Sequence, residues 1–86
     1  MNIKEFREEL NKVGLSLLWE SDKNKLAVWN PNFANPLLWM NPYEENYKGN
    51  VGVKSINAPL FSETQIRRAI ILADEFLQTP LKDRGL

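Results

Sequence analysis

The fold of this chain is decided by residues 61–80, which read FSETQIRRAIILADEFLQTP. Ser62 is a favourable N-cap residue, and Gln65 follows it by three positions, which is the spacing of a capping box. Pro80 cannot continue a helix because it lacks a backbone amide donor. The stretch therefore predicts an amphipathic helix over about residues 63–78.

A second amphipathic helix is predicted at the start of the chain. Asn2 and Glu5 repeat the capping-box spacing, and Gly14 suits the left-handed backbone position that ends many helices. The apolar residues between them follow the helical period: Ile3, Phe6, Leu10 and Val13. The two predicted helices therefore lie at the two ends of the chain, and the middle of the sequence connects them.

The middle of the chain predicts a small antiparallel sheet. Short runs rich in apolar residues occupy positions 15–20, 25–30, 37–40 and 51–56. Three Asn-Pro steps exclude a helix from residues 30–42, because proline moves the preceding residue out of helical geometry. The chain therefore predicts one domain over residues 1–86, a two-layer α+β fold with the order α-β-β-β-(β)-α. We expect a meander that carries both helices on one face.

The periodicities also predict which side chains are buried. The predicted core contains Ile3, Phe6, Leu10, Val13, Leu17, Trp19, Val28, Val53, Ile66, Ile70, Ala73 and Leu77. Ile71 falls outside the apolar face of its helix and is expected to be partly exposed. Both faces of the predicted hairpin carry apolar residues, so its inner face stays unassigned. The uncovered face is expected to expose Trp29, Trp39 or Leu38.

Composition restricts the classes of function. Eleven basic residues balance eleven acidic ones, whereas proteins that bind nucleic acid through phosphates usually carry a basic excess. The chain has no Cys and no His, which removes thiolate nucleophiles, Cys/His zinc sites and imidazole acid–base chemistry. Its glycines form no phosphate-binding loop. We therefore expect no enzyme, catalytic residue, metal site, cofactor or small-molecule substrate.

The apolar runs are short, so no membrane-spanning segment is expected. The charged, amphipathic N-terminal segment is unlike a signal peptide. These features favour a cytoplasmic location.

The aromatic residues allow two readings. Tryptophans at positions 19, 29 and 39 can fill the space between a small sheet and two helices. Alternatively, Trp29, Trp39, Tyr43 and Tyr47 form a patch for a protein partner, since Trp and Tyr are favoured at binding hot spots. Trp39 is the strongest candidate, because it lies between two prolines and close to both tyrosines.

A set of cations near the C-terminus defines the alternative function, weak binding of nucleic acid. Its members are Arg67, Arg68, Lys82 and Arg84, supported by exposed aromatic residues. The two groups of cations meet only if the tail folds back on the helix. The more direct reading of the two helical arginines is a solvated helix face with acidic neighbours such as Glu63, one turn before Arg67, or Asp74.

Residues 76–85, FLQTPLKDRG, resemble the end of small proteins from phages and prophages of Gram-positive bacteria. Those proteins close with an amphipathic helix, then Thr-Pro, an apolar residue, two polar residues and Arg. The resemblance implies an accessory role and no catalytic residues. The leading hypothesis is a protein-interaction module or assembly factor that binds an unidentified host or phage protein, or a second copy of itself through the open sheet face.

Overall fold

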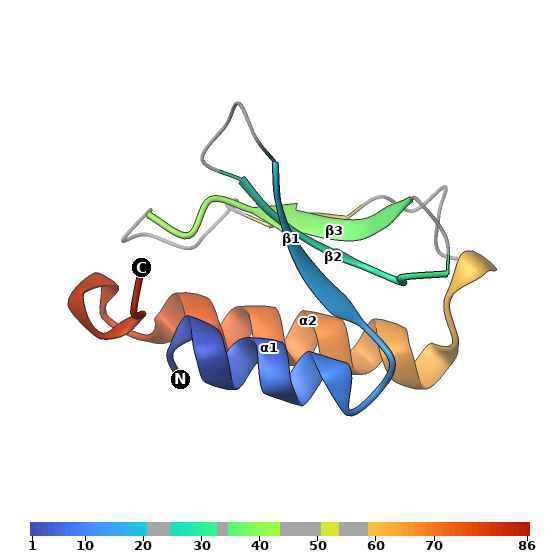
Figure 1. Cartoon of the computed structure of the whole chain (residues 1–86), viewed down its shortest axis with the longest axis horizontal. Coiled ribbons are helices and arrows are strands. Elements are labelled where there is room, and N and C mark those ends of the chain that lie inside the picture. Colours follow the sequence, from blue (N-terminus) through green and yellow to red (C-terminus); the bar gives the residue numbers. More distant parts are fainter. Residues whose placement is uncertain (21–24, 33–34, 44–50, 54–58) are drawn as a thin grey trace.

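The computed structural model describes residues 1–20, 25–32, 35–43, 51–53 and 59–86. Two helices lie along one face of an antiparallel sheet, and both chain ends lie at the same end of the molecule (Figure 1). The elements are α1 (Ile3–Asn11), β1 (Ser16–Glu20), β2 (Lys25–Trp29), β3 (Pro36–Met40), β4 (Val51–Val53), α2 (Glu63–Gln78) and the 3-10 turn η2 (Leu81–Asp83). This order confirms the predicted two-layer α+β fold.

The sheet is a meander in the order β1-β2-β3-β4. Val28 on the central strand β2 is opposite Leu17 on β1 and Leu38 on β3. All three side chains belong to the hydrophobic core, so this register identifies the face that the helices cover. Leu38 is fully buried, which corrects its inclusion among the residues expected on the uncovered face.

A β-bulge explains how two consecutive leucines of β3 are both buried. The β2–β3 register shifts between Val28 and Trp29, so that Trp29 is opposite Pro36 and Leu37 has no direct partner. A bulge breaks the strict alternation of side chains between the two faces. Leu37 and Leu38 therefore both join the core.

Both helices begin at the predicted capping boxes. The Glu5 amide donates to Asn2 Oδ1 at 2.9 Å, and the Gln65 amide donates to Ser62 Oγ at 3.1 Å. In return, the Glu5 side chain accepts from the Asn2 amide, and the Gln65 side chain accepts from the Ser62 amide. Gln65 has a further role, because its Nε2 donates to the Val13 carbonyl at 2.9 Å. The start of α2 is thereby joined to the chain that leaves α1.

Gly14 occupies the left-handed region with φ of 77°, as predicted. Gly14→Ala is expected to lower the free energy of unfolding by about 1–2 kcal/mol, because an L side chain is strained there. The added Cβ would also lie 3.4 Å from Gln65 Nε2. Gly14→Asn is the matched control and should lose less, since Asn tolerates this region better. Urea unfolding followed by circular dichroism measures both; an Ala variant as stable as the parent chain would contradict the assignment.

The predicted core is largely confirmed, with two errors. Trp19 lies at the end of edge strand β1 and is 38% exposed, and Ile70 is 46% exposed. The side of α2 that faces the core is centred on Ala69, Ala73 and Phe76, and Ile70 is rotated about 100° from Ala69 along the helix. The predicted residue Val53 has a side chain outside the described part of the structure.

Candidate functional site

The uncovered face of the sheet is centred on Ala27. Ala27 is opposite Leu18 on β1 and Trp39 on β3, and Trp29 lies two positions further along the same strand, so these side chains share one face. Among the described residues, no helix covers this face. Ala27 is nevertheless only 3% exposed, whereas Leu18 is 46% exposed.

These side chains form an open groove of about 310 Å³. Its lining residues are Leu18, Glu20, Ala27, Trp29 and Pro36. Apart from Glu20, every lining residue has an apolar or aromatic side chain. We call Leu18, Ala27, Trp29, Pro36 and Trp39 together the outer-face surface.

The two tryptophans of the outer-face surface are half-buried and differ in their polar contacts. Trp39 carries Lys25 Nζ over its ring, 4.4 Å from the ring centroid, which is cation–π geometry. The Trp29 Nε1 atom is buried and donates no hydrogen bond. An unpaired buried donor costs about 1–3 kcal/mol, so Trp29 is held at the groove at an energetic penalty.

Of the two predicted tyrosines, only Tyr43 is described. Its side chain is exposed, and the centroid of its ring lies 6.1 Å from the centroid of the Trp19 ring. Trp19 alternates with Leu18 along β1 and therefore projects toward the helix side of the sheet. The structure thus brings Tyr43 to Trp19 and not to the groove. Tyr47 lies outside the described residues.

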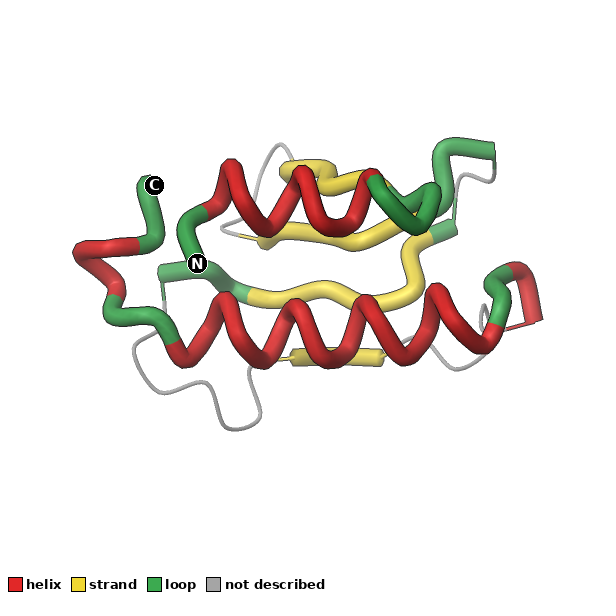
Figure 2. Tube along the Cα trace, turned by 90° about the horizontal axis from the view of Figure 1, so that it is seen from below, coloured by secondary structure: helices red, strands yellow, loops and turns green. Residues whose placement is uncertain are grey.

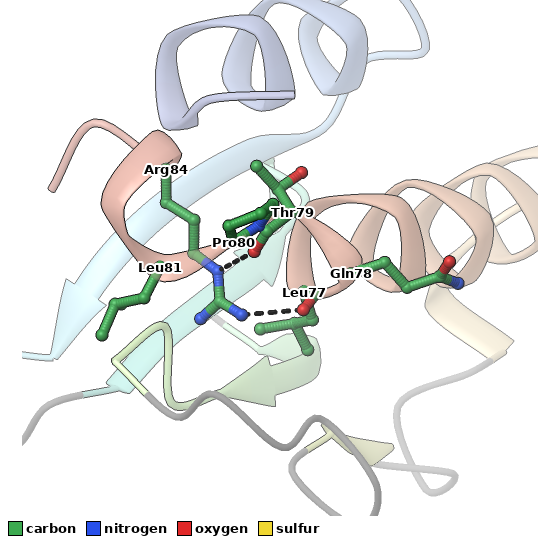
Figure 3. Close-up of a pocket in the computed structure, with 6 residues that line it drawn as sticks. All are labelled: Leu77, Gln78, Thr79, Pro80, Leu81 and Arg84. Atoms are coloured by element: carbon green, nitrogen blue, oxygen red, sulfur yellow. Dashed lines mark hydrogen bonds between the residues drawn. The ribbon is translucent and has the colours of Figure 1, made fainter.

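Arg84 does not belong to a surface patch of cations. Its side chain is buried, with 1% exposed, and its guanidinium points at the end of α2 (Figure 3). Nε donates to the Thr79 carbonyl at 2.8 Å, Nη2 to the Leu77 carbonyl at 2.7 Å and Nη1 to the Pro42 carbonyl at 2.6 Å. The tail does fold back, as the alternative function required, but it turns this cation inward.

The other predicted cations are spread along the molecule. Arg67 is exposed and pairs with Glu63 one turn earlier on α2. Arg68 is half-buried and lies close enough to Glu9 on α1 to affect its carboxylate. The pKa of Glu9 is lowered mainly by a hydrogen bond from Lys12 and by the charge of Lys12, and the charge of Arg68 adds a smaller contribution. Lys82 lies on η2, beyond the opposite end of α2. The four residues therefore do not form one phosphate-binding patch.

A second cavity, of about 320 Å³, lies at the end of α2 (Figure 3). Its lining residues are Leu77, Gln78, Thr79, Pro80, Leu81 and Arg84. The three Arg84 hydrogen bonds described above all go to backbone carbonyls, so this region is part of the scaffold. Within the described ranges there is no group of three acidic, His or Cys side chains that could hold a metal ion. No described helix is long and apolar enough to cross a membrane.

The sequence predicted Trp29 and Trp39 on the face opposite the helices, and it did not predict Leu18, Ala27 or Pro36 there. The strand period would have grouped Leu18 with the tryptophans once Leu17 was known to face the helices. Comparisons with protein-family models, curated proteins and solved structures found no match to this chain.

Proposed function

We propose that this chain is a small cytoplasmic protein-interaction module that binds another protein through the outer-face surface. The observation that carries the proposal is a sheet face that no described helix covers, on which two half-buried tryptophans lie and one of them, Trp29, lines an apolar groove. Tryptophan side chains are enriched at the hot spots of protein interfaces. Catalysis plays no part in this role.

The unpaired indole of Trp29 supports the same proposal. Buried polar atoms are nearly always hydrogen-bonded in folded proteins, and exceptions call for an explanation. A partner that brings an oxygen acceptor to this end of the groove would satisfy Nε1 after a small movement of the ring. Binding would then relieve a penalty that the free chain carries.

The setting we propose follows from the resemblance of the C-terminal residues to small phage and prophage proteins. The partner would be a host or phage protein, and the chain an accessory or assembly factor. This setting determines where the partner should be sought, namely in a Gram-positive host with and without phage infection.

The proposal is tested with Leu18→Lys, which places a charge in the groove at an exposed position. The tagged chain is purified from the host, and co-purifying proteins are quantified by mass spectrometry. We expect one protein to be recovered in near-equal amount by the parent chain and to fall at least tenfold with Leu18→Lys, since desolvating one lysine disfavours binding.

Tyr43→Lys is the matched control, because Tyr43 and Leu18 are both 46% exposed but lie on different surfaces. It should retain the partner. Equal recovery with Leu18→Lys, or no protein partner in either condition, would refute the proposal. Recovery of nuclease-sensitive material instead would favour the nucleic-acid alternative.

A further inference from the structure

An unusually regular stripe of exposed side chains runs along α2. Its members lie within about 100° of one another around the helix axis: Glu63, Arg67, Ile70, Ile71, Asp74 and Gln78. At its centre Ile70 is 46% and Ile71 is 47% exposed. Two adjacent exposed isoleucines in the middle of a charged stripe are not needed for folding, because the core lies on the other side of the helix.

The spacing of this stripe is symmetric. Its positions are separated by 4, 3, 1, 3 and 4 residues, a series that reads the same in both directions. A second α2 laid antiparallel across the first, about a twofold axis between Ile70 and Ile71, therefore meets the same stripe. Each Ile70 then faces Ile71 of the other copy. Each Arg67 faces Asp74 of the other copy.

The charges match this twofold arrangement. Arg67 and Asp74 are seven residues apart, about 10 Å along the axis, so they lie too far apart to pair within one helix. Each is already supported on its own helix: Arg67 pairs with Glu63, and Gln78 Nε2 donates to Asp74 Oδ2 at 2.6 Å. Across the twofold axis, Arg67 of each copy would contact Asp74 of the other copy, so the dimer would contain two such ion pairs.

We propose that a second copy of this chain docks antiparallel on α2, with the two isoleucines at the centre and an ion pair on each flank. The contact goes beyond the proposed function and does not depend on it, because the outer-face surface lies on the face of the sheet opposite the helices. Figure 2 shows both helices in front of the strands. A module with both contacts would present two partner-binding grooves per dimer.

The proposed contact between the two copies is expected to be weak, because its area is small. α2 has 16 residues and is about 24 Å long, and one helix pair buries less than the roughly 1,200 Å² that stable interfaces need. We therefore expect a monomer–dimer equilibrium with a dissociation constant of about 10 μM to 1 mM. Sedimentation velocity over a concentration series detects this range.

Charge exchange tests the geometry directly. Arg67→Asp alone brings carboxylates face to face at both flanks, and Asp74→Arg alone brings guanidiniums face to face. Each variant is expected to dimerise at least tenfold more weakly than the parent chain. An equimolar mixture of the two should recover dimerisation, because every facing pair in the mixed dimer has opposite charges.

Two further variants complete the test. Ile71→Lys should abolish the dimer, and Leu18→Lys, equally exposed but on the sheet face, should leave it unchanged. Thermal unfolding confirms that each variant is folded. A chain that stays monomeric at about 1 mM, a mixture that fails to recover dimerisation, or a dimer that only Leu18→Lys disrupts would overturn the proposal. The last outcome would locate self-association on the sheet face.

Discussion

Arg84→Met is expected to lower the free energy of unfolding by about 3–4 kcal/mol. A domain of 86 residues has a total stability of about 4–13 kcal/mol, so this single change would remove a large share of it. Met keeps the apolar stem of the side chain but removes every donor.

The effect is large because the Arg84 guanidinium joins the end of α2 to Pro42, which follows β3 in the chain. Its guanidinium donates to Leu77 and Thr79 carbonyls at the end of α2, where a helix has unsatisfied acceptors and favours positive charge. It also reaches the Pro42 carbonyl that follows β3. The Arg84 carbonyl in turn accepts from the Ile3 amide at 2.7 Å, which fixes the start of α1. Without the guanidinium, the buried carbonyls of Leu77 and Pro42 lose this donor.

Two controls separate charge from geometry. Arg84→Lys keeps the charge but cannot direct donors to three carbonyls at once, so we expect an intermediate loss. Arg67→Met removes an exposed arginine in a surface ion pair and should change stability by less than about 1 kcal/mol. Urea unfolding followed by circular dichroism gives all three values. An Arg84→Met chain within about 1 kcal/mol of the parent would contradict the role assigned to Arg84.

Phe76→Ala is expected to cost about 3–5 kcal/mol. Phe76 is fully buried, its ring is stacked on that of Phe6 with centroids 4.9 Å apart, and the Arg84 guanidinium carbon lies 5.8 Å from its centroid. Truncation therefore leaves a cavity between the two helices and removes a face on which the guanidinium packs. Thermal and urea unfolding measure the loss.

A double-mutant cycle isolates the stacked pair. Phe6→Leu and Phe76→Leu each retain most of the buried volume, so both single variants should fold. We expect a coupling of about 0.5–1.5 kcal/mol between them. Phe61→Leu with Phe76→Leu is the control pair, since no ring contact joins these two residues within the described structure. Strictly additive losses for Phe6 and Phe76 would exclude a specific contribution from stacking.

The features that were predictable from sequence are those with local causes. A capping box needs only two residues three positions apart, and the turn at Gly14 needs only one residue that accepts positive φ. Both are therefore readable from the chain, as are the helix ends. The order of the strands followed because short polar and Asn-Pro connections favour antiparallel neighbours.

The features that were missed depend on contacts between distant residues. The position of Arg84 depends on the Pro42 carbonyl, 42 residues earlier, and no local pattern reveals that distance. Ile70 follows the helical period of the apolar residues in α2, which predicted that it is buried. The side of α2 that packs on the core is instead centred on two alanines and Phe76, so Ile70 lies at its margin. The outer-face surface could not be assigned because both sides of the hairpin are apolar and a bulge alters the alternation at Leu37.

The most direct test of the outer-face surface uses the three tryptophans as reporters. Each indole Nε1–H gives one signal in the nitrogen–proton spectrum of the labelled chain, assigned by single Trp→Phe variants. When the protein recovered with the chain is titrated in, the signals of Trp29 and Trp39 are predicted to shift while that of Trp19, on the helix side, stays in place. A shift of Trp19 alone, or no shift at a saturating amount of partner, would contradict the account.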